Sequence, residues 1–336
     1  MKCDVVIIGA GPGGLKAAEI LAQNNKKVLV LEKNEYIGKK VCAAGLTIKD
    51  FEFIPRKLVE REFNRIIIHT PLQKTIIKSD KPFVFTTNRI KLGKYMAKKV
   101  LDAGADIKIN TLVTKIKESS VIANNKEIKF DYLIGADGST SILRKYLNIP
   151  TNNLMMAVQY IIKKKFKDME LFIDINKFGP SYAWMFPYKN STSIGTGTIN
   201  KFMKMNELRK NFDNFCKDKF EIKNSEFQAH PINHDYQGHE FNNKFLIGDA
   251  AGFTSSVTGE GIYQAIVSGY DVANKIIDPS YKYRYLNKLI KRKSQERKLF
   301  KIATFNPFLT RILSEIGVLS LKTPIGKKIV LKVSNG

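Results

Sequence analysis

The sequence predicts an α/β fold with a discontinuous nucleotide-binding domain, a second domain built mainly of β-strands, and a helical C-terminal region. Three observations predict it. Hydrophobic strands ending in glycine-rich or acidic turns occur near residues 9–32, 137 and 249. The segments between them read mainly as strands, and the residues after 281 follow helical spacing. Because the three motifs are far apart in 336 residues, the domain that contains them must be discontinuous.

The first motif is a buried strand, a glycine turn, a helix and a second strand that ends in an acid. Its residues are Asp4–Ile8, then Gly9-Ala-Gly11-Pro-Gly13-Gly14, a helix from Gly13 to about Asn24, and Lys27–Glu32. Gly9 makes the tight turn, Gly11 lets the backbone approach a pyrophosphate, and Gly14 lets the helix pack closely on the strand. The pyrophosphate would sit at the helix N-terminus, and Glu32 would accept from both ribose hydroxyls. A Rossmann-like unit that binds an ADP-containing dinucleotide is predicted.

Two later strands end in further motifs. Residues 130–138 end in Gly-Ala-Asp-Gly, and residues 245–252 end in Gly-Asp-Ala-Ala-Gly. The latter is followed by Thr258-Gly259-Glu-Gly261-Ile262 and a helical stretch over 263–277. Asp249 at a strand end can bond a ribityl hydroxyl, and a helix N-terminus near Gly261 and Ile262 would favour negative charge on a reduced flavin ring. Either motif alone is also typical of a tight turn after a buried strand.

In this order, the three motifs resemble the FAD-binding superfamily that includes p-hydroxybenzoate hydroxylase. The resemblance implies FAD, which the first glycine motif alone does not separate from NAD. The chain contains no second GxGxxG, no CxxC and no CxxxxC. A disulfide reductase with its own nicotinamide domain is therefore disfavoured, and a nicotinamide donor would bind transiently.

The expected domains follow from these motifs. The FAD-binding domain would comprise 1–50, 84–150 and 240–280, the substrate domain 51–83 and 151–239, and the helical C-terminal region 281–336. Within them we expect a hairpin over 64–78 turning at Pro71, a helix over 88–104 and strand pairs over 106–130. Further strands are expected over 154–163, 170–175, 181–188, 191–198 and 225–229, with helices over 204–216 and from Tyr281 onward.

Two further stretches resemble one family more narrowly. They are Gly38-Lys-Lys-Val-Cys42-Ala43-Ala44-Gly45-Leu46 and Tyr182-Ala-Trp184-Met-Phe186-Pro187, the latter followed by Gly195-Thr-Gly197. Together they are similar to the geranylgeranyl reductase family, especially the archaeal digeranylgeranylglycerophospholipid reductases that saturate the isoprenoid chains of ether phospholipids. The chain is shorter than many members, mostly in its C-terminal region. The resemblance therefore does not predict the shape of the far end of the tunnel that would hold the lipid. The chain also reads Cys-Ala-Ala-Gly where some relatives are richer in glycine.

The resemblance implies FAD contacts at ten positions: Gly13, Glu32, Cys42, Ala43, Gly45, Arg89, Val113, Asp249, Gly261 and Ile262. Arg89 offers donors to a phosphate or a flavin oxygen, and Val113 would act through its backbone toward the adenine. Without the resemblance, these two would read as an ordinary helix-start arginine and an ordinary core valine. No metal site is expected.

Tyr182, Trp184 and Phe186 alternate along an expected strand, so their side chains would point to one face. That face would either line a tunnel for a long prenyl chain or form an aromatic core strand.

The activity that the resemblance implies is FAD-dependent saturation of C=C bonds in geranylgeranyl chains of archaeal-type ether lipid precursors. An isolated alkene needs a hydride from the flavin and a proton on its other carbon. Cys42 is the candidate that the sequence singles out to supply the proton, although it would also fit as a packing residue at the ring edge. Two alternatives remain: a flavin-dependent monooxygenase or hydroxylase on the same scaffold, and a membrane-associated FAD electron shuttle. The donor is left open between ferredoxin, a deazaflavin and NAD(P)H, as is the oligomeric state.

The formal net charge of +25 points to an anionic partner or to a lysine-rich solvated surface. No nucleic-acid recognition motif stands out, which disfavours nucleic acid. A basic run over 291–301 leads into apolar residues at helical spacing: Phe305, Phe308, Leu309, Ile312, Leu313, Ile316 and Leu319. This segment would either lie on an anionic membrane or pack on its own domain.

The compartment expected from the sequence is a reducing cytoplasm, with peripheral contact to the cytoplasmic face of a membrane as an open alternative. The three cysteines, Cys3, Cys42 and Cys216, are too scattered for a disulfide framework. No apolar run reaches the about 20 residues that span a bilayer. The first strand begins directly at the N-terminus, so no signal peptide is expected.

Overall fold

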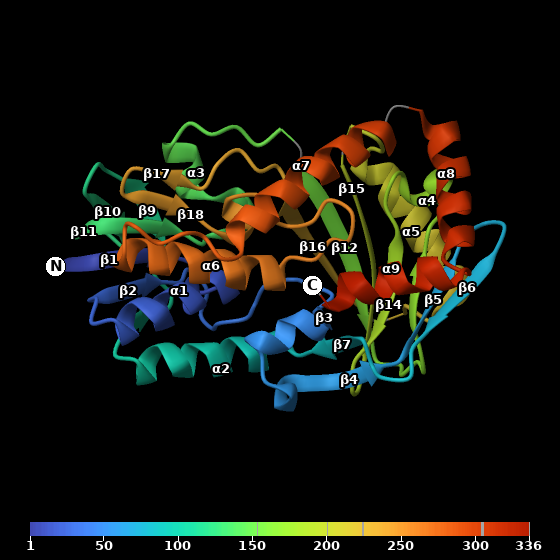
Figure 1. Cartoon of the computed structure of the whole chain (residues 1–336), viewed down its shortest axis with the longest axis horizontal. Coiled ribbons are helices and arrows are strands. Elements are labelled where there is room, and N and C mark those ends of the chain that lie inside the picture. Colours follow the sequence, from blue (N-terminus) through green and yellow to red (C-terminus); the bar gives the residue numbers. More distant parts are fainter. Residues whose placement is uncertain (153, 200, 224, 304–305, 336) are drawn as a thin grey trace. The chain divides into compact units, whose positions relative to one another are not determined.

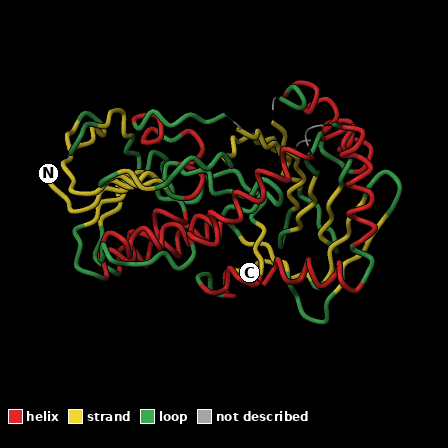
Figure 2. The backbone as a smooth tube through the Cα atoms, turned by 45° about the horizontal axis from the view of Figure 1, so that its top comes forward, coloured by secondary structure: helices red, strands yellow, loops and turns green. Residues whose placement is uncertain are grey.

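A computed structural model describes residues 1–152, 154–199, 201–223, 225–303 and 306–335 (Figure 1). The chain forms two compact units, each assembled from three segments. The first unit comprises Met1–Lys40, Arg89–Leu154 and Ile232–Glu296, and the second comprises Val41–Asn88, Met155–Pro231 and Arg297–Gly336. In each unit the strands gather into sheets with helices beside them (Figure 2). The predicted α/β class is confirmed, whereas the domain boundaries expected from the motifs stay a prediction.

The first unit is built on an eight-stranded sheet with a parallel centre. Strand β1 pairs in parallel with β2 and with β11, and β18 and β8 extend the sheet in parallel on either side. All four residues of β2 are buried, as expected of a strand covered on both faces. The strands are β1 (Lys2–Ile8), β2 (Val28–Leu31), β8 (Asp106–Lys108), β9 (Val113–Ile116), β10 (Ser120–Ala123), β11 (Lys126–Gly135), β17 (Glu240–Phe241) and β18 (Lys244–Leu246).

Glycines bring two helices of this unit into close contact. A Cβ on Gly13 of α1 would lie 2.6 Å from the Ala265 carbonyl oxygen, and one on Gly269 of α6 would lie 2.2 Å from the Gly13 carbonyl oxygen. The two helix backbones therefore touch where only glycine fits. The helices beginning in this unit are α1 (Pro12–Gln23), α2 (Arg89–Asp102), α3 (Ile142–Tyr146), α6 (Ile262–Ile277) and α7 (Leu286–Ala303), with short 3-10 turns η3 (Gly138–Thr140) and η4 (Gly248–Ala250).

The second unit contains a seven-stranded sheet in the order β16-β12-β15-β14-β13-β5-β6 and a three-stranded sheet in the order β3-β7-β4. One face of the larger sheet packs on α5, burying Phe212 and Phe215 against strand residues such as Val158 and Met185. The strands are β3 (Gly45–Thr47), β4 (Val59–Phe63), β5 (Arg65–His69), β6 (Lys74–Lys78), β7 (Val84–Thr87), β12 (Leu154–Ile162), β13 (Met169–Phe172), β14 (Ala183–Pro187), β15 (Thr192–Ile199) and β16 (Glu226–Asn233). The helices are α4 (Ile175–Phe178), α5 (Met205–Lys219), α8 (Pro307–Ser320) and α9 (Pro324–Asn335), with 3-10 turns η1 (Ile48–Glu52) and η2 (Arg56–Leu58).

Most expected elements are confirmed, including the hairpin of β5 and β6 and the helices α2 and α5. Several expectations are wrong at their ends; the strand expected over 225–229, for example, runs to Asn233. Two of these differences have a clear local cause. The C-terminal helices begin at Leu286 rather than Tyr281, because the Asp271 carboxylate accepts the backbone N–H groups of Arg284, Tyr285 and Leu286 at 3.2, 2.7 and 2.7 Å. The strand expected over 170–175 ends at Phe172, since Asp174 caps α4. Among the described residues, no helix is long and apolar enough to cross a membrane.

Candidate cofactor and substrate sites

The glycine turn between β1 and α1 has the geometry that its sequence predicts. Gly9 has φ of +102°, and a Cβ there would lie 2.4 Å from the Ala136 carbonyl oxygen. A Cβ on Gly14 would lie 2.2 Å from the Gly9 carbonyl oxygen, so the helix packs as closely as the turn allows. At Gly11, by contrast, a Cβ would have only the Ala136 oxygen nearby, at 3.9 Å. Gly11 therefore leaves open space at the N-terminus of α1, where unpaired N–H groups favour an anion.

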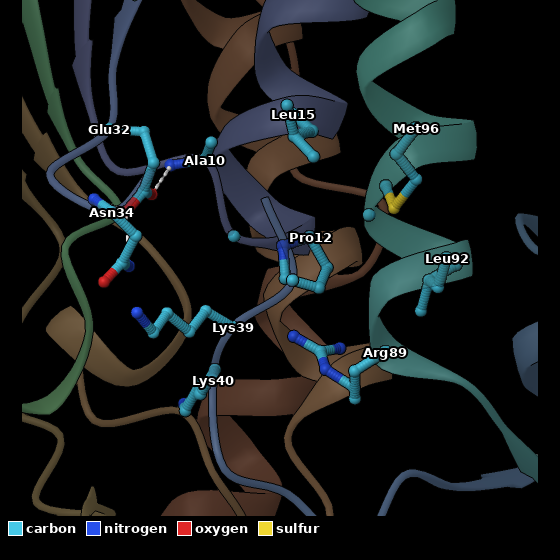
Figure 3. A pocket seen from close by; sticks show the side chains of 13 residues that line it. Ala10, Pro12, Leu15, Glu32, Asn34, Lys39, Lys40, Arg89, Leu92 and Met96 are labelled. Carbon is cyan, nitrogen blue, oxygen red and sulfur yellow. Dashed lines mark hydrogen bonds between the residues drawn. The ribbon is translucent and has the colours of Figure 1, made fainter. Parts of the chain in front are cut away.

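That open space belongs to a pocket of the first unit (Figure 3). Its walls come from the β1–α1 turn, the end of β2, the loop that follows it, and the start of α2. The lining residues are Ala10, Gly11, Pro12, Leu15, Glu32, Asn34, Gly38, Lys39, Lys40, Arg89, Leu92, Gly93 and Met96.

Glu32 is held rigidly at one side of the pocket. Its Oε2 accepts the Ala10 N–H at 2.8 Å, and its Oε1 accepts from the backbone and side chain of Asn34 at 2.8 and 2.6 Å. Each carboxylate oxygen can accept more than one hydrogen bond, so hydroxyl donors can still be accommodated. Asn34 was not singled out from the sequence, where its only signal was its place two residues after Glu32.

Arg89 begins α2 and lines the same pocket, with its guanidinium directed toward Pro12 (Figure 3). Its Nε and Nη1 atoms are buried and have no hydrogen-bond partner among the described residues. A buried guanidinium without acceptors is costly, so these atoms fit an anionic group in the pocket. Lys39 and Lys40 line the pocket as well. Arg89 and the open N-terminus of α1 together suit a dinucleotide pyrophosphate.

Val113 is buried on β9, and its segment is tied to the end of β2. The Thr111 N–H donates to the Glu32 carbonyl oxygen at 2.8 Å, and the Asn110 N–H donates to that of Asn34 at 3.0 Å. These bonds place the start of β9 close to Glu32, on the side of the pocket where an adenosine ribose is expected. The structure thus brings the start of β9 near Glu32, and the contact of Val113 with FAD stays a prediction.

Asp249 lies in the first unit, in the turn after β18, and is not among the residues that line the pocket. Lys40 Nζ lies 2.6 Å from its Oδ2, to which Ser139 also donates at 3.1 Å, and Thr254 donates to its Oδ1 at 2.8 Å. Burial alone would raise the pKa of Asp249, but Lys40 and the two hydroxyl donors outweigh it and hold the pKa below its ordinary value. Asp249 is therefore an ionised acceptor at neutral pH.

The start of α6 lies beside this carboxylate. Gly261 precedes the helix, and a Cβ there would lie 3.0 Å from Thr254 Oγ1 and 3.6 Å from Asp249 Oδ1. Gly259 has φ of +66°, which favours glycine in the turn that leads to Ile262. The structure thus brings the start of α6 at Gly261 next to the Asp249 carboxylate. Lys40, Ser139 and Thr254 were missed as partners, and for Lys40 the only available signal was its position two residues before Cys42.

Cys42, Ala43 and Gly45 belong to the second unit, in a loop fixed by hydrogen bonds. The Ala44 N–H donates to Cys42 Sγ at 3.3 Å, the Tyr188 hydroxyl donates to the Ala43 carbonyl oxygen at 2.9 Å, and the Thr87 N–H donates to that of Ala44 at 3.1 Å. Ala44 has φ of +50°, a conformation that alanine rarely adopts. The half-buried thiol is therefore held in one position by its neighbours.

Trp184 and Phe186 share one face of β14 and are half-buried, whereas Ala183 and Met185 on the opposite face are buried in the core with α5. The aromatic residues are thus outside the α5 core. A Cβ on Gly195, which pairs with Trp184, would lie 2.2 Å from Cζ2 of the indole, so the ring lies directly over this glycine.

Polar and aromatic neighbours fix the indole of Trp184 from two sides. Its Nε1 donates to Ser193 Oγ at 2.9 Å, and the Ser193 hydroxyl donates to Gln159 at 2.9 Å. Tyr182 immediately precedes the strand, and its ring meets Trp184 edge-on with centroids 6.4 Å apart. Tyr182 and Trp184 are therefore in contact, with Gly195 and Gly197 in the adjacent strand, whereas Phe186 packs against the cluster that contains Phe63. Their role in substrate binding stays a prediction.

The glycine turn, the acid at the end of β2 and the pocket that they share define a protein that binds an ADP-containing dinucleotide. A family model described as an FAD binding domain matches residues 2–305. The chain is 31% identical over 319 residues to an uncharacterized protein of Methanosarcina barkeri, covering 89% of this chain and 81% of that protein. It is 31% identical over 314 residues to digeranylgeranylglycerophospholipid reductase 1 of Methanosphaera stadtmanae, covering 82% and 76%.

Solved structures show the same fold. A geranylgeranyl bacteriochlorophyll reductase-like protein from Thermoplasma acidophilum superposes with a TM-score of 0.76 at 22% identity, covering 99% of this chain and 91% of that one. A flavin-dependent brominase gives 0.72 at 15% identity, covering 100% and 94%. The chain belongs to the FAD-binding family that includes the geranylgeranyl reductases. It is an FAD-dependent oxidoreductase of the geranylgeranyl reductase type, and the predicted family and cofactor are confirmed.

Proposed function

We propose that this protein saturates C=C bonds of geranylgeranyl chains in archaeal-type ether lipid precursors, a reaction of membrane phospholipid biosynthesis. The observation that carries the proposal is the 31% identity over 314 residues to a digeranylgeranylglycerophospholipid reductase, which extends over segments of both units. An external donor, either ferredoxin, a deazaflavin or NAD(P)H, would supply the electrons. The net charge of +25 suits an anionic lipid headgroup and peripheral binding at the cytoplasmic face of a membrane.

The residues of the first unit fit FAD. Gly9, Gly11 and the start of α1 would receive the pyrophosphate together with Arg89, whose buried Nε and Nη1 lack protein acceptors among the described residues. Glu32 would accept from the ribose hydroxyls. When bound and reduced, FAD supplies the hydride for one alkene carbon.

Asp249 and the start of α6 would hold the ribityl and flavin end of the cofactor. Asp249 is ionised and accepts from two hydroxyls already, and the N-terminus of α6 at Gly261 and Ile262 favours negative charge. Gly13 would act mainly through packing, because it forms the contact between α1 and α6. Gly14 and Gly259 would likewise shape the backbone of the site, Gly14 through close packing and Gly259 through its positive φ, and would not contact the ligand.

Cys42 would deliver the proton to the other alkene carbon. A thiol is a proton donor, and the hydrogen bonds from Tyr188 and Thr87 to the Ala43 and Ala44 carbonyls fix the backbone of its loop. Ala43 and Gly45 would contact the flavin through the backbone of this same loop. The balance is one hydride and one proton for each C=C bond reduced.

Tyr182, Trp184 and Phe186 would form the apolar wall along which the prenyl chain lies. They present half-buried aromatic rings, and Gly195 and Gly197 add no side-chain bulk beside them. An extended isoprenoid chain needs a long apolar surface of this kind, since it has no polar group to anchor it.

The test is anaerobic. The purified holoprotein is reduced with a stoichiometric amount of dithionite, a detergent-dispersed geranylgeranyl-glycerol phospholipid is added, and the flavin absorbance is followed. We expect reoxidation without oxygen and a product heavier by two hydrogens for each bond reduced. A flavin that stays reduced until air enters would overturn the proposal and favour an oxygenase or an electron shuttle.

The role of Cys42 is tested separately with Cys42→Ala. Turnover should fall at least about tenfold with FAD retained, as expected when a positioned general acid is removed. Cys216→Ala is the matched control, because this thiol is buried in the α5 core. Unchanged turnover in Cys42→Ala would assign the thiol a packing role only.

A further inference from the structure

Helix α8 of the second unit is oriented with its apolar side toward solvent. Its buried side is made by Thr310 and Val318, which are 7% and 3% exposed, with Ser314 half-buried between them. A helix that packs on a domain normally buries its apolar stripe, and here the polarity is reversed. The outward residues, called the α8 apolar face below, are Phe308, Leu309, Ile312, Leu313, Ile316 and Leu319, which are between 40% and 71% exposed. Phe305, expected at the head of this stripe, lies outside the described residues.

Hydrogen bonds to the β5–β6 hairpin fix this orientation. The Glu315 carboxylate accepts from Thr70 Oγ1 at 2.6 Å, from the Leu72 N–H at 3.2 Å and from Gln73 Nε2 at 3.0 Å. Gln73 Nε2 also donates to the Glu315 carbonyl oxygen at 2.8 Å. Val318 packs in the same cluster as Phe63 and Ile77. Turning the apolar face inward would break these contacts, so its exposure is built into the fold.

Further apolar side chains are exposed in segments next to α8. Leu72, at the turn whose N–H bonds Glu315, is 75% exposed. Helix α9 packs tightly on the end of α8, since a Cβ on Gly326 would lie 2.2 Å from the Ser320 carbonyl oxygen. It exposes Ile325 and Ile329 to 75% and 56%. An unpartnered apolar surface of this kind marks an interaction site.

The charge of the same segment identifies the partner. Residues 297–336 contain eight lysines and arginines, and Glu315 is their single acid. That acid is half-buried against the hairpin. The cations are Arg297, Lys298, Lys301, Arg311, Lys322, Lys327, Lys328 and Lys332. An apolar helix side within a segment this rich in cations suits an anionic bilayer, where apolar residues enter the acyl region and cations meet lipid phosphates. A second copy of the chain would bring two such basic segments together, which their like charge opposes.

We propose that the α8 apolar face is the surface by which this protein docks on an anionic lipid bilayer. The inference deepens, and rests on, the peripheral membrane association included in the proposed function, because it names the helix and the side that enter the membrane. Docking through a fixed helix face, rather than through a spanning segment, makes the association reversible and dependent on salt.

The experiment is flotation of the holoprotein with vesicles made of equal parts phosphatidylcholine and phosphatidylglycerol. Wild-type protein should float with these vesicles, and binding should weaken in high salt and on pure phosphatidylcholine. Ile316→Ser should bind about tenfold more weakly or worse, the effect expected from removing one large apolar side chain from the interface. Leu101→Ser is the matched control, because Leu101 of α2 is 55% exposed against 56% for Ile316.

Two results would overturn the docking surface: wild-type protein that does not float, or Ile316→Ser that floats as well as wild type. Concentration-dependent self-association that Ile316→Ser abolishes, with no vesicle binding, would assign the face to a second copy instead. Flavin reoxidation by detergent-dispersed lipid is measured on the same samples and should be unaffected by Ile316→Ser. If flotation depends on Ile316 but no reoxidation occurs in wild type, the docking surface stands and the reductase proposal fails. If wild-type flavin is reoxidised by the lipid but flotation does not depend on Ile316, the reductase proposal stands and the docking surface fails.

Discussion

Gly11 and Gly14 are three residues apart in one turn, yet a methyl group on each would meet different surroundings. On Gly14 it would lie 2.2 Å from the Gly9 carbonyl oxygen, whereas on Gly11 its nearest neighbour would be 3.9 Å away. We therefore expect Gly14→Ala to destabilise the protein by about 1–3 kcal/mol or more, as overpacking does. Gly11→Ala should keep the free energy of unfolding within about 1 kcal/mol but weaken FAD at least about tenfold, since its methyl group enters the pocket.

Urea unfolding and FAD titration of the two apoproteins measure both effects. The assignment of Gly11 to the cofactor and Gly14 to packing would be wrong if Gly11→Ala bound FAD like wild type, or if Gly14→Ala were as stable as wild type.

Arg89 is the second residue whose surroundings predict a measurable effect. Its guanidinium has buried donors for which the described protein offers no acceptors, and a charge-assisted bond is worth about 1.5–3 kcal/mol. Arg89→Leu should therefore raise the FAD dissociation constant about 10- to 100-fold. Lys98→Leu is the control, because Lys98 is an exposed cation of the same helix. Equal FAD affinity in the two variants would remove Arg89 from the cofactor site.

At the scale of elements, α7 anchors the loop before α6 through a buried charge pair. Glu296 accepts from Ser255 Oγ at 2.6 Å and from the Ser256 N–H at 3.0 Å, and Lys293 Nζ lies 3.4 Å from Glu296 and donates to the Thr254 carbonyl oxygen at 2.7 Å. Burial would raise the pKa of Glu296, but Ser255 and Lys293 hold it below its ordinary value. Side chains of α7 therefore fix the loop that leads to Gly261.

Removing one member of this pair should cost more than removing both. Glu296→Ala leaves the buried Lys293 without its carboxylate, and we expect a loss of about 3–5 kcal/mol in unfolding free energy. The double variant Glu296→Ala with Lys293→Met should recover part of that loss. Chemical denaturation of both proteins provides the comparison. Strictly additive losses would mean that the two charges are not coupled.

Elements with local signals were predictable from the sequence, and those fixed by distant partners were not. The β1–α1–β2 unit follows from Gly9, Gly14 and Glu32, because the turn, the close packing and the acid are all local in the chain. The start of α7 depends on Asp271 in α6, and the orientation of α8 depends on Glu315 meeting the β5–β6 hairpin. Helical spacing alone indicates an apolar face but not which side of the helix its neighbours will cover.

At the scale of the whole molecule, the same distinction holds for the site. The three motifs and their order identified the fold and FAD, since each motif carries its own glycine or acid. Lys40 and Asp249 are 209 positions apart, so the sequence near either residue does not indicate that they pair. The unsatisfied guanidinium of Arg89 likewise exists only once α2 is folded against its neighbours. Contacts of this kind follow from the tertiary structure, not from any window of residues.

The stability of the whole protein should fall in mild acid because of buried histidines. Burial and the nearby Lys293 lower the pKa of His234 to about 4, and burial also lowers that of His239. In the unfolded chain these groups take up protons near their ordinary pKa of about 6.5. Between about pH 6.5 and 4 the unfolded state therefore binds more protons, so stability is full above this range and is lost as pH falls through it. His234 alone would contribute about 3 kcal/mol to this loss.

Urea unfolding of the holoprotein at a series of pH values measures this dependence. His234→Gln should flatten the decline relative to wild type. The difference between the variant and wild-type curves isolates this histidine, because Gln at position 234 takes up no proton in either state. Parallel curves for His234→Gln and wild type would show that acid destabilises the protein through other groups. The carboxylates of Glu296 and Asp249 are such groups, and their lowered pKa values predict a loss of stability only at lower pH.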